Sequence, residues 1–159
     1  MPGRAQPHLE TVGVIGGGAW GTALAAFAAA NGGPVMLWAR EPEVVAAIQR
    51  EHRNPVFLPT VPLDPAIRAT GDLAEVAAAD LLLLVAPAQH LRNVLTALAP
   101  HLREATPLVI CAKGIEQETG ALLNEVVEAT VPEAPVAVLS GPTFAIEVAS
   151  GLPTAVTLA

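Results

Sequence analysis

The sequence VGVIGGGAWG, residues 12–21, decides the fold. It places Gly16, Gly18 and Gly21 in the spacing G-x-G-x-x-G, after a short apolar run and before an alanine-rich stretch. In this arrangement the first glycine permits a tight strand-to-helix turn, the second lets the backbone approach a pyrophosphate, and the third lets the helix pack close to the sheet. The helix that follows would present free amides and its positive dipole end to phosphate groups. An ordinary glycine-rich turn is the alternative, but the strand-turn-helix context favours a dinucleotide-binding turn.

Outward from this turn, short apolar runs alternate with helix-forming stretches. The run DLLLLVAP at 80–87 is the clearest strand, because its continuous apolar character suits a parallel strand buried on both faces. We expect strands at 11–15, 34–39, 67–70, 80–87, 107–112, 135–140 and near the last residues. We expect helices at 20–30, 41–53, from Asp72 to about 78, 89–99, 120–130 and 143–150. The residues at 54–65 should form a proline-rich loop. This alternation predicts an α/β fold: a doubly wound, mostly parallel sheet of the Rossmann type with helices on both faces.

The bulk composition limits the classes of partner. The 159 residues suit one domain, and their 52% hydrophobic share is enough for a sizeable core. The formal net charge of −7 argues against a nucleic-acid partner, which would need a basic patch. No stretch is long and apolar enough to cross a bilayer, and the polar first ten residues lack the apolar run of a signal peptide. With Cys111 as the single cysteine, no disulfide can form within the chain. We therefore expect a cytoplasmic protein with no membrane insertion.

The residue type at the end of the second expected strand bears on the choice of cofactor. An acidic side chain there would bind the ribose 2′-hydroxyl of NAD, but the sequence LWAREPE places Arg40 at that point. A guanidinium group favours a 2′-phosphate through its charge and its forked hydrogen bonds. We therefore expect NADP, as NADPH, to be preferred. Two alternatives stay open: Arg40 is a solvated residue that starts a helix, and the adjacent Glu41 allows some use of NAD.

Two further segments with candidate binding residues directly follow expected strands. They would lie at the edge of the sheet where ligands bind in open α/β folds. Lys113, the only lysine of the chain, comes directly after an apolar strand in VICAKGIE. It could bind an anionic substrate or a carbonyl oxygen that gains charge during hydride transfer, or it could simply be solvated. In SGPTFAIE, residues 140–147, Gly141 and Thr143 could offer an amide and a hydroxyl to an oxyanion. The alternative there is an ordinary turn capped by Thr143.

Other chemistry finds little support in the sequence. His8, His52, His90 and His101 lack the spacing of a metal site, and Cys111 has no partner for zinc. His90 could approach the nicotinamide ribose, but a histidine on the surface of a helix is an equal alternative. Neither a nucleophile elbow nor a paired-carboxylate motif supports hydrolysis.

Together, these motifs resemble the bacterial-type NAD(P)-dependent glycerol-3-phosphate dehydrogenase family. The resemblance runs in order from about residue 11 to the last residue and rests on GVIGGGAWGTALA, LWAR, NPVFLP, AKGIEQETG and SGPTFAIEVASGLPTAVTLA. It implies an amino-terminal NAD(P)-binding domain, residues 1–159, that precedes an all-helical domain of similar size. It also implies the reversible interconversion of dihydroxyacetone phosphate and sn-glycerol 3-phosphate, which feeds phospholipid synthesis.

The resemblance also implies roles for residues at matching positions. Cofactor contacts fall on Gly16, Gly18, Ala19, Trp20, Gly21, Arg40, Phe57, Lys113 and Ala145, and substrate contacts fall on Lys113, Gly141 and Thr143. This chain departs from the family at Ala19 and Ala88, where serine is usual, and at Phe57, where tyrosine is often found. Each of these changes removes a hydroxyl group and with it a candidate hydrogen bond.

The role of proton donor in this reaction has no matching residue in this chain. In the family the proton-donating lysine lies in the helical domain, so the resemblance places it beyond Ala159 and leaves no catalytic residue here. The final stretch GLPTAVTLA, typical of a strand that stops without a tail, fits a missing second domain. Two alternatives stay open: an NAD(P)-binding module without turnover, and a related β-hydroxyacid or ketopantoate-type reductase, which should lack SGPTFAIE. Whether the full-length protein forms a homodimer also stays open.

Overall fold

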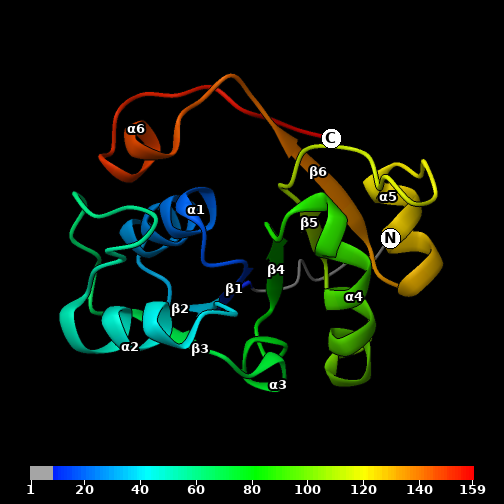
Figure 1. Ribbon diagram of the computed structural model, residues 1–159, viewed down its shortest axis with the longest axis horizontal. Coiled ribbons are helices and arrows are strands. Elements are labelled where there is room, and N and C mark those ends of the chain that lie inside the picture. Colours follow the sequence, from blue (N-terminus) through cyan, green and yellow to red (C-terminus); the bar gives the residue numbers. More distant parts are fainter. Residues whose placement is uncertain (1–8) are drawn as a thin grey trace, which may run out of the picture.

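The computed structural model of the protein describes residues 9–159 and contains one seven-stranded sheet with helices on both faces (Figure 1). The strands are β1 (Val12–Ile15), β2 (Val35–Trp38), β3 (Ile67–Thr70), β4 (Leu81–Leu84), β5 (Leu108–Ile110), β6 (Val136–Ser140) and β7 (Thr157–Leu158). The helices are α1 (Ala19–Ala30), α2 (Pro42–Glu51), α3 (Leu73–Val76), α4 (Ala88–Leu98), α5 (Leu123–Thr130) and α6 (Ala145–Ala149), with a short 3-10 helix at Ala99–His101.

The topology places a switch point at the centre of the sheet. The strand order is β3-β2-β1-β4-β5-β6-β7, and all neighbouring strands run parallel except β6 and β7. The chain builds outward from β1 to β3 and then crosses back to β4, which pairs with the free side of β1. Ile15 therefore lies between Trp38 on β2 and Leu84 on β4. The loops that follow β1 and β4 diverge at this point, which is where ligands bind in sheets of this kind.

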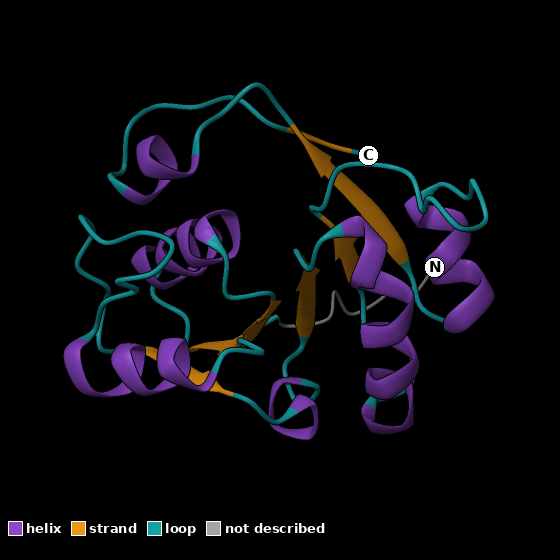
Figure 2. Cartoon of the chain, in the orientation of Figure 1, coloured by secondary structure: helices purple, strands orange, loops and turns teal. Residues whose placement is uncertain are grey.

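Two apolar layers enclose the sheet, whose strands Figure 2 shows in orange between the helices in purple. On one face, residues such as Val14 pack with Ile48 of α2 and with α1. On the other, residues such as Ile15 pack with Leu95 of α4 and with α3 and α5. Val14 and Ile15 are neighbours that point to opposite faces, as strand geometry requires, and both are fully buried. Burial on both faces explains why the central strands are continuously apolar.

The expected fold class is confirmed, and each expected strand and helix is present with its ends shifted by a few residues. The largest shifts are of three residues: β4 ends at Leu84 rather than at 87, and α5 begins at Leu123 rather than near 120. Gly120 has a φ of +72°, outside the helical range, and Ile115 pairs with Leu122 in an isolated bridge. The residues before α5 therefore form a loop that folds back on itself instead of a first helical turn.

The segment from β6 to β7 makes an excursion over one face of the sheet. Figure 1 shows it leaving β6, forming α6 beside α1, and returning to pair with β6. Between α1 and this segment lies a groove of about 420 Å³ whose lining includes Phe27, Val156 and Leu158, all of them exposed. This face is therefore covered less completely than the face beneath α4 and α5. No helix within residues 9–159 is long and apolar enough to cross a membrane.

Candidate functional site

The carboxyl ends of β1, β4, β5 and β6 open into two neighbouring cavities. The first, of about 310 Å³, is lined by the glycine turn together with Arg40 and Phe57. The second, of about 380 Å³, is lined by Trp20 and by the loops that follow β5 and β6. Val85 and Pro87, at the end of β4, line both cavities. The two cavities therefore adjoin and form one cleft across the switch point of the sheet.

The glycines shape the turn between β1 and α1. Gly16 has a φ of +133°, which other residue types rarely adopt. A Cβ atom at Gly21 would collide with the carbonyl oxygen of Gly16, so α1 can approach the turn only with glycine at this position. A Cβ atom at Gly18 would meet nothing within 4 Å, so this residue borders open space. Gly18 is also the N-cap of α1 and has no side chain to bind the first helical amides, which remain available to an anion.

Arg40 and Glu41 form one wall of the first cavity. The Nη2 atom of Arg40 lies 3.2 Å from Oε1 of Glu41, and the arginine side chain is 72% exposed. An exposed ion pair of this kind is weak, so the guanidinium can turn toward a ligand at little cost in free energy. Trp38 lies in the same cavity and donates a hydrogen bond from Nε1 to the carbonyl oxygen of Gly71 at 3.1 Å, which fixes the orientation of its ring.

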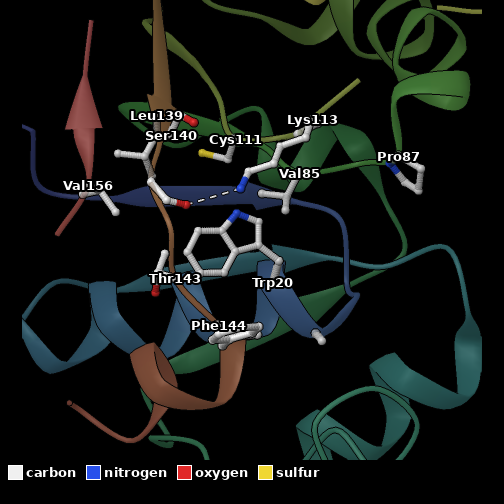
Figure 3. Close-up of a pocket in the computed structure, with 14 residues that line it drawn as sticks. Trp20, Val85, Pro87, Cys111, Lys113, Leu139, Ser140, Thr143, Phe144 and Val156 are labelled. Carbon is white, nitrogen blue, oxygen red and sulfur yellow. Dashed lines mark hydrogen bonds between the residues drawn. The ribbon is translucent and has the colours of Figure 1, made fainter. Parts of the chain in front are cut away.

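Polar groups from separate strands meet in the second cavity, where Figure 3 shows Lys113 and Trp20 extending into the same space. The Nζ atom of Lys113 donates a hydrogen bond of 3.3 Å to the carbonyl oxygen of Gly141. The hydroxyl of Thr143 is buried and has no hydrogen-bond partner within residues 9–159. It does not cap α6, which begins after Phe144. A buried hydroxyl without a partner is unfavourable unless a ligand or water binds it.

Cys111 lies at the base of the second cavity, directly before the loop that carries Lys113. The residue is 1% exposed, and burial raises the pKa of its thiol to about 12. The nucleophilic form of cysteine is the thiolate, which this environment disfavours at neutral pH. Cys111 is therefore part of the wall of the cavity rather than a reactive group.

The family of the chain follows from its sequence as a whole. A family model described as the N-terminus of NAD-dependent glycerol-3-phosphate dehydrogenase matches residues 11–159. The chain belongs to this family. The match includes the glycine turn, the loop of Lys113 and the SGPTFAIE turn, so it covers each part of the cleft.

Relatives with known names agree with the family. The chain is 63% identical over 151 residues to the glycerol-3-phosphate dehydrogenase (NAD(P)+) of Paramagnetospirillum magneticum, covering 95% of this chain and 55% of that protein. The protein of the same name from Parvibaculum lavamentivorans is 60% identical over 148 residues, with coverages of 93% and 44%. The crystal structure of glycerol-3-phosphate dehydrogenase from Coxiella burnetii superposes with a TM-score of 0.88 at 36% identity, covering 94% of this chain and 46% of that one. The chain thus spans about half the length of the relatives it matches.

A more distant fold neighbour bears on the ketopantoate-type alternative. The ketopantoate reductase of Ralstonia eutropha JMP134 superposes with a TM-score of 0.67 at 21% identity, covering 84% of this chain and 42% of that one. At this identity the likeness concerns the fold alone. The glycerol-3-phosphate dehydrogenase family, in contrast, matches the motifs of the cleft themselves.

The structure gathers the predicted site residues of this family around the cleft. Gly16, Gly18, Arg40 and Phe57 line the first cavity, and Ala19, Trp20, Lys113, Gly141, Thr143 and Ala145 line the second. Gly21 lies in α1 directly behind the turn. His90, in the first turn of α4, lines the first cavity and not the cavity of Lys113. Their roles in binding stay predictions. Within residues 9–159 no group of His, Cys, Asp or Glu side chains could hold a metal ion, and His8 lies outside the described residues.

A group of side-chain hydrogen bonds that holds the loop of Lys113 was not predicted from the sequence. Arg92 on α4 forms two hydrogen bonds with the carboxylate of Glu116, at 2.9 and 2.8 Å, and Thr119 donates a third. The Arg92 and Thr119 hydrogen bonds lower the pKa of Glu116, while the hydrogen bond to Glu116 raises the pKa of Arg92. Gln89 adds hydrogen bonds to the same loop. The partners are 24 residues apart in sequence, and no local pattern joins them.

A second missed residue is Asn54, at the start of the proline-rich loop. The prediction of a loop at 54–65 is confirmed, since the structure contains no helix or strand there. The loop is nevertheless anchored, because Asn54 is completely buried and its side-chain amide bonds to Gly17 and Thr22 beside the glycine turn. An asparagine next to a proline is typical of turns, so the sequence carried no signal for this contact.

Proposed function

We propose that this chain is the cofactor-binding domain, residues 1–159, of an sn-glycerol-3-phosphate dehydrogenase that transfers hydride between NAD(P)H and dihydroxyacetone phosphate and so feeds glycerophospholipid synthesis. The observation that carries the proposal is the cleft itself. It joins a glycine turn suited to a pyrophosphate with two groups suited to a small phosphorylated substrate, a lysine and a hydroxyl that has no partner among the described residues. The names of the relatives at about 60% identity support the same activity.

The residues of the cleft fit a dinucleotide. Open space at Gly18 leaves room for phosphate oxygens against the first amides of α1. From this turn, the first cavity would hold the adenosine half beside Arg40 and Phe57. The second cavity would hold the nicotinamide half between Trp20 and Ala145. When bound, the reduced cofactor supplies the hydride.

The chain's own groups would bind and orient the substrate. The Lys113 ammonium would attract the phosphate or the carbonyl oxygen, on which negative charge grows during hydride transfer. The Thr143 hydroxyl would gain the hydrogen-bond partner that it lacks within the described residues. Lys113 is placed here as a binding group, and the proton donor is expected from a second, helical domain matching the other half of the relatives' length.

We propose that NADP is preferred, with NAD also accepted. The exposed guanidinium of Arg40 is free to form charge-assisted hydrogen bonds to a 2′-phosphate. Glu41 lies beside it, and its carboxylate could accept a hydrogen bond from an unmodified ribose while repelling the phosphate. A cytoplasmic location would suit the single buried thiol of Cys111 and a supply of reduced cofactor.

The two tryptophans give a direct test of cofactor binding. Trp20 lines the second cavity and Trp38 the first, and the chain contains no other tryptophan and no tyrosine. Intrinsic emission therefore comes from the cleft, and we expect NADPH and NADH to quench it saturably. The activity test places this chain in front of the second half of the Paramagnetospirillum magneticum relative and follows NADPH oxidation with dihydroxyacetone phosphate.

The two measurements separate the possible outcomes. Binding by the chain alone, with turnover only in the joined protein, is the expected result. Binding without turnover in the joined protein would support the alternative of a binding module. Robust turnover by the chain alone would show that the proton donor lies within these 159 residues. Absence of NADPH binding would overturn the proposal altogether.

A further inference from the structure

Both polar atoms of the Asn54 side chain form hydrogen bonds within the protein. It is completely buried, and its Nδ2 atom donates hydrogen bonds of 2.8 Å to the carbonyl oxygen of Gly17 and of 2.8 Å to Oγ1 of Thr22. Its Oδ1 atom accepts a hydrogen bond of 3.1 Å from the backbone N–H of Phe57. Three of the four hydrogen bonds open to a primary amide are thus made by this one side chain.

These bonds join the glycine turn and the start of α1 to the proline-rich loop, which is far from both in sequence. Gly17 belongs to the glycine turn, Thr22 to the first turns of α1, and Phe57 to the proline-rich loop at the wall of the first cavity. The separations from Asn54 to Gly17 and Thr22 are 37 and 32 residues. Asn54 therefore links the phosphate-binding turn directly to the wall on the adenosine side.

The loop does not need this amide to stay attached to the protein. Leu58, Val61 and Leu63 are buried in the same apolar layer as α1 and α2 and anchor the loop by packing. Backbone hydrogen bonds from Leu58 to Asn54 and from Leu63 to His52 close it. Loss of the side-chain amide would thus leave the loop in place. It would free the Phe57 N–H and, among the described residues, leave the Gly17 carbonyl oxygen with only the longer hydrogen bond, 3.5 Å, from Oγ1 of Thr22.

The direction of the Gly17 carbonyl has a consequence for anion binding. In a planar trans peptide the N–H points opposite to the C=O, so the bond from Asn54 to the Gly17 oxygen also fixes the direction of the Gly18 N–H. Gly18 lines the first cavity at its open side. An aspartate at position 54 could not do the same, because a carboxylate oxygen would face the Gly17 oxygen without a proton between them.

We propose that Asn54 is a positioning residue for the dinucleotide: it holds the amide of the pyrophosphate-binding turn and the Phe57 wall in one fixed arrangement. The inference rests on the proposed function, because it deepens the account of the same cofactor site. Thr22 shares this role, since its hydroxyl accepts one of the two amide hydrogens. Preorganised groups of this kind raise affinity because the protein need not order them on binding.

The test compares cofactor affinity with stability in matched variants. Asn54→Ala, Asn54→Asp, Thr22→Val and Thr22→Ser are titrated with NADPH by tryptophan emission and unfolded with urea. The control is Thr11→Val, which removes a comparable pair of side-chain hydrogen bonds with Asp80 at the amino ends of β1 and β4. We expect Asn54→Ala and Thr22→Val to raise the Kd for NADPH by about tenfold, Asn54→Asp by more, and Thr22→Ser and Thr11→Val to leave it within about twofold.

Ligand fragments add a readout that general destabilisation would not move. ADP-ribose contains the pyrophosphate, whereas adenosine 5′-monophosphate does not, so the loss in Asn54→Ala should be larger for ADP-ribose. Equal Kd values for NADPH in the wild type, Asn54→Ala and Thr22→Val would overturn the inference, as would equal losses for both fragments. If Asn54→Ala fails to fold, the Thr22→Val and Thr22→Ser pair decides alone. Failure of the wild type to bind NADPH would instead overturn the proposed function.

Discussion

The Nζ atom of Lys113 donates its hydrogen bond to the carbonyl oxygen of Gly141 at 3.3 Å, and so joins the loop after β5 to the turn after β6. An ammonium group has three donors, and one bond to a neutral carbonyl uses a single donor. The hydroxyl of Thr143, which lines the same cavity, is buried and has no hydrogen-bond partner within residues 9–159. The loop itself is fixed from the other side by the Arg92–Glu116 pair. The cavity thus presents a cation that is held in place but keeps its capacity to bind an anion.

Removal of this cation should affect the substrate more than the cofactor. In the joined protein described above, Lys113→Met is expected to lower kcat/KM for dihydroxyacetone phosphate by about 100-fold, as for loss of one charged group that stabilises growing charge. The Kd for NADPH, measured by tryptophan emission, should change far less. Because Lys113 is the only lysine of the chain, amine modification of the isolated domain with the α-amino group blocked offers an independent probe. An unchanged kcat/KM in Lys113→Met would contradict the placement of the substrate in the second cavity.

Thr143→Val separates binding from folding at the same site. The wild-type hydroxyl makes no hydrogen bond within the described residues, so replacing it with a methyl group removes no bond and buries a more apolar atom. We expect the free energy of unfolding to stay within about 0.5 kcal/mol of the wild type or to rise, while KM for dihydroxyacetone phosphate increases by about tenfold. Urea unfolding and steady-state kinetics measure the two effects. A large loss of stability would mean that the hydroxyl has a partner within the protein.

The Arg40–Glu41 pair should set the ratio of NADPH to NADH affinity. Arg40→Asp is expected to lower this ratio by about tenfold or more, because it replaces a favourable contact with a 2′-phosphate by a repulsive one. Glu41→Gln should raise the ratio by a few fold, since it frees the guanidinium and removes a negative charge beside the phosphate. Glu43→Gln, in the first turn of α2 that Glu41 precedes as the N-cap, changes the net charge equally and serves as the control. If the ratio is the same in Arg40→Asp as in the wild type, the assignment of Arg40 is wrong.

The features predicted correctly from sequence depend on local constraints. The glycine turn could be identified because Gly16 and Gly21 meet local requirements that other residues would not, namely the positive φ of Gly16 and the close contact of Gly21 with Gly16. The strands could be identified because burial on both faces leaves a continuous apolar run. Lys113 stood out because a charged residue at the carboxyl end of such a run faces the crevice.

The features that were missed depend on side chains that meet across long separations. Asn54 is 37 residues from Gly17, and Arg92 is 24 residues from Glu116, so neither pair produces a periodic pattern. Both pairs connect surface loops to the edge of the site, where the path of the backbone decides which side chains meet. The start of α5 was misplaced for a related reason, because Glu116 and its partners hold the preceding residues in a loop.

Cys111 should react slowly in the folded protein. Its thiol is buried and has a pKa of about 12, so thiolate is scarce between pH 7 and pH 9. We expect a disulfide reagent such as 5,5′-dithiobis(2-nitrobenzoate) to label native protein at pH 8 at least about 100-fold more slowly than urea-unfolded protein. NADPH should slow labelling further, because Cys111 lies at the base of the second cavity. Equal rates in the native and unfolded protein would contradict the buried position.

Asp80 should make the stability of the domain depend on pH in the acid range. Its carboxylate accepts hydrogen bonds from the Thr11 hydroxyl at 2.8 Å, the Thr11 N–H at 3.0 Å and the Arg103 guanidinium at 2.9 Å. The Thr11 hydroxyl first, and then Arg103, lower the pKa of Asp80 well below its ordinary value of 3.8. A depressed pKa in the folded state means that the stabilisation is fully present above about pH 4 and is lost progressively as the pH falls further.

Asp80→Asn tests this dependence against the wild type in urea unfolding at several pH values. At pH 7 we expect a lower unfolding midpoint for the variant, because the charge-assisted hydrogen bonds are weakened. The difference should shrink as the pH falls below 4, since the wild-type carboxylate then becomes protonated. Arg103→Gln removes the weaker of the two main hydrogen bonds that lower the pKa of Asp80. It should therefore lower the unfolding midpoint less than Asp80→Asn does. The difference in unfolding midpoint between the wild type and Asp80→Asn could instead stay constant from pH 7 to pH 2. The ionised form of Asp80 would then contribute nothing to folding, and its bonds at the amino ends of β1 and β4 would act as neutral hydrogen bonds only.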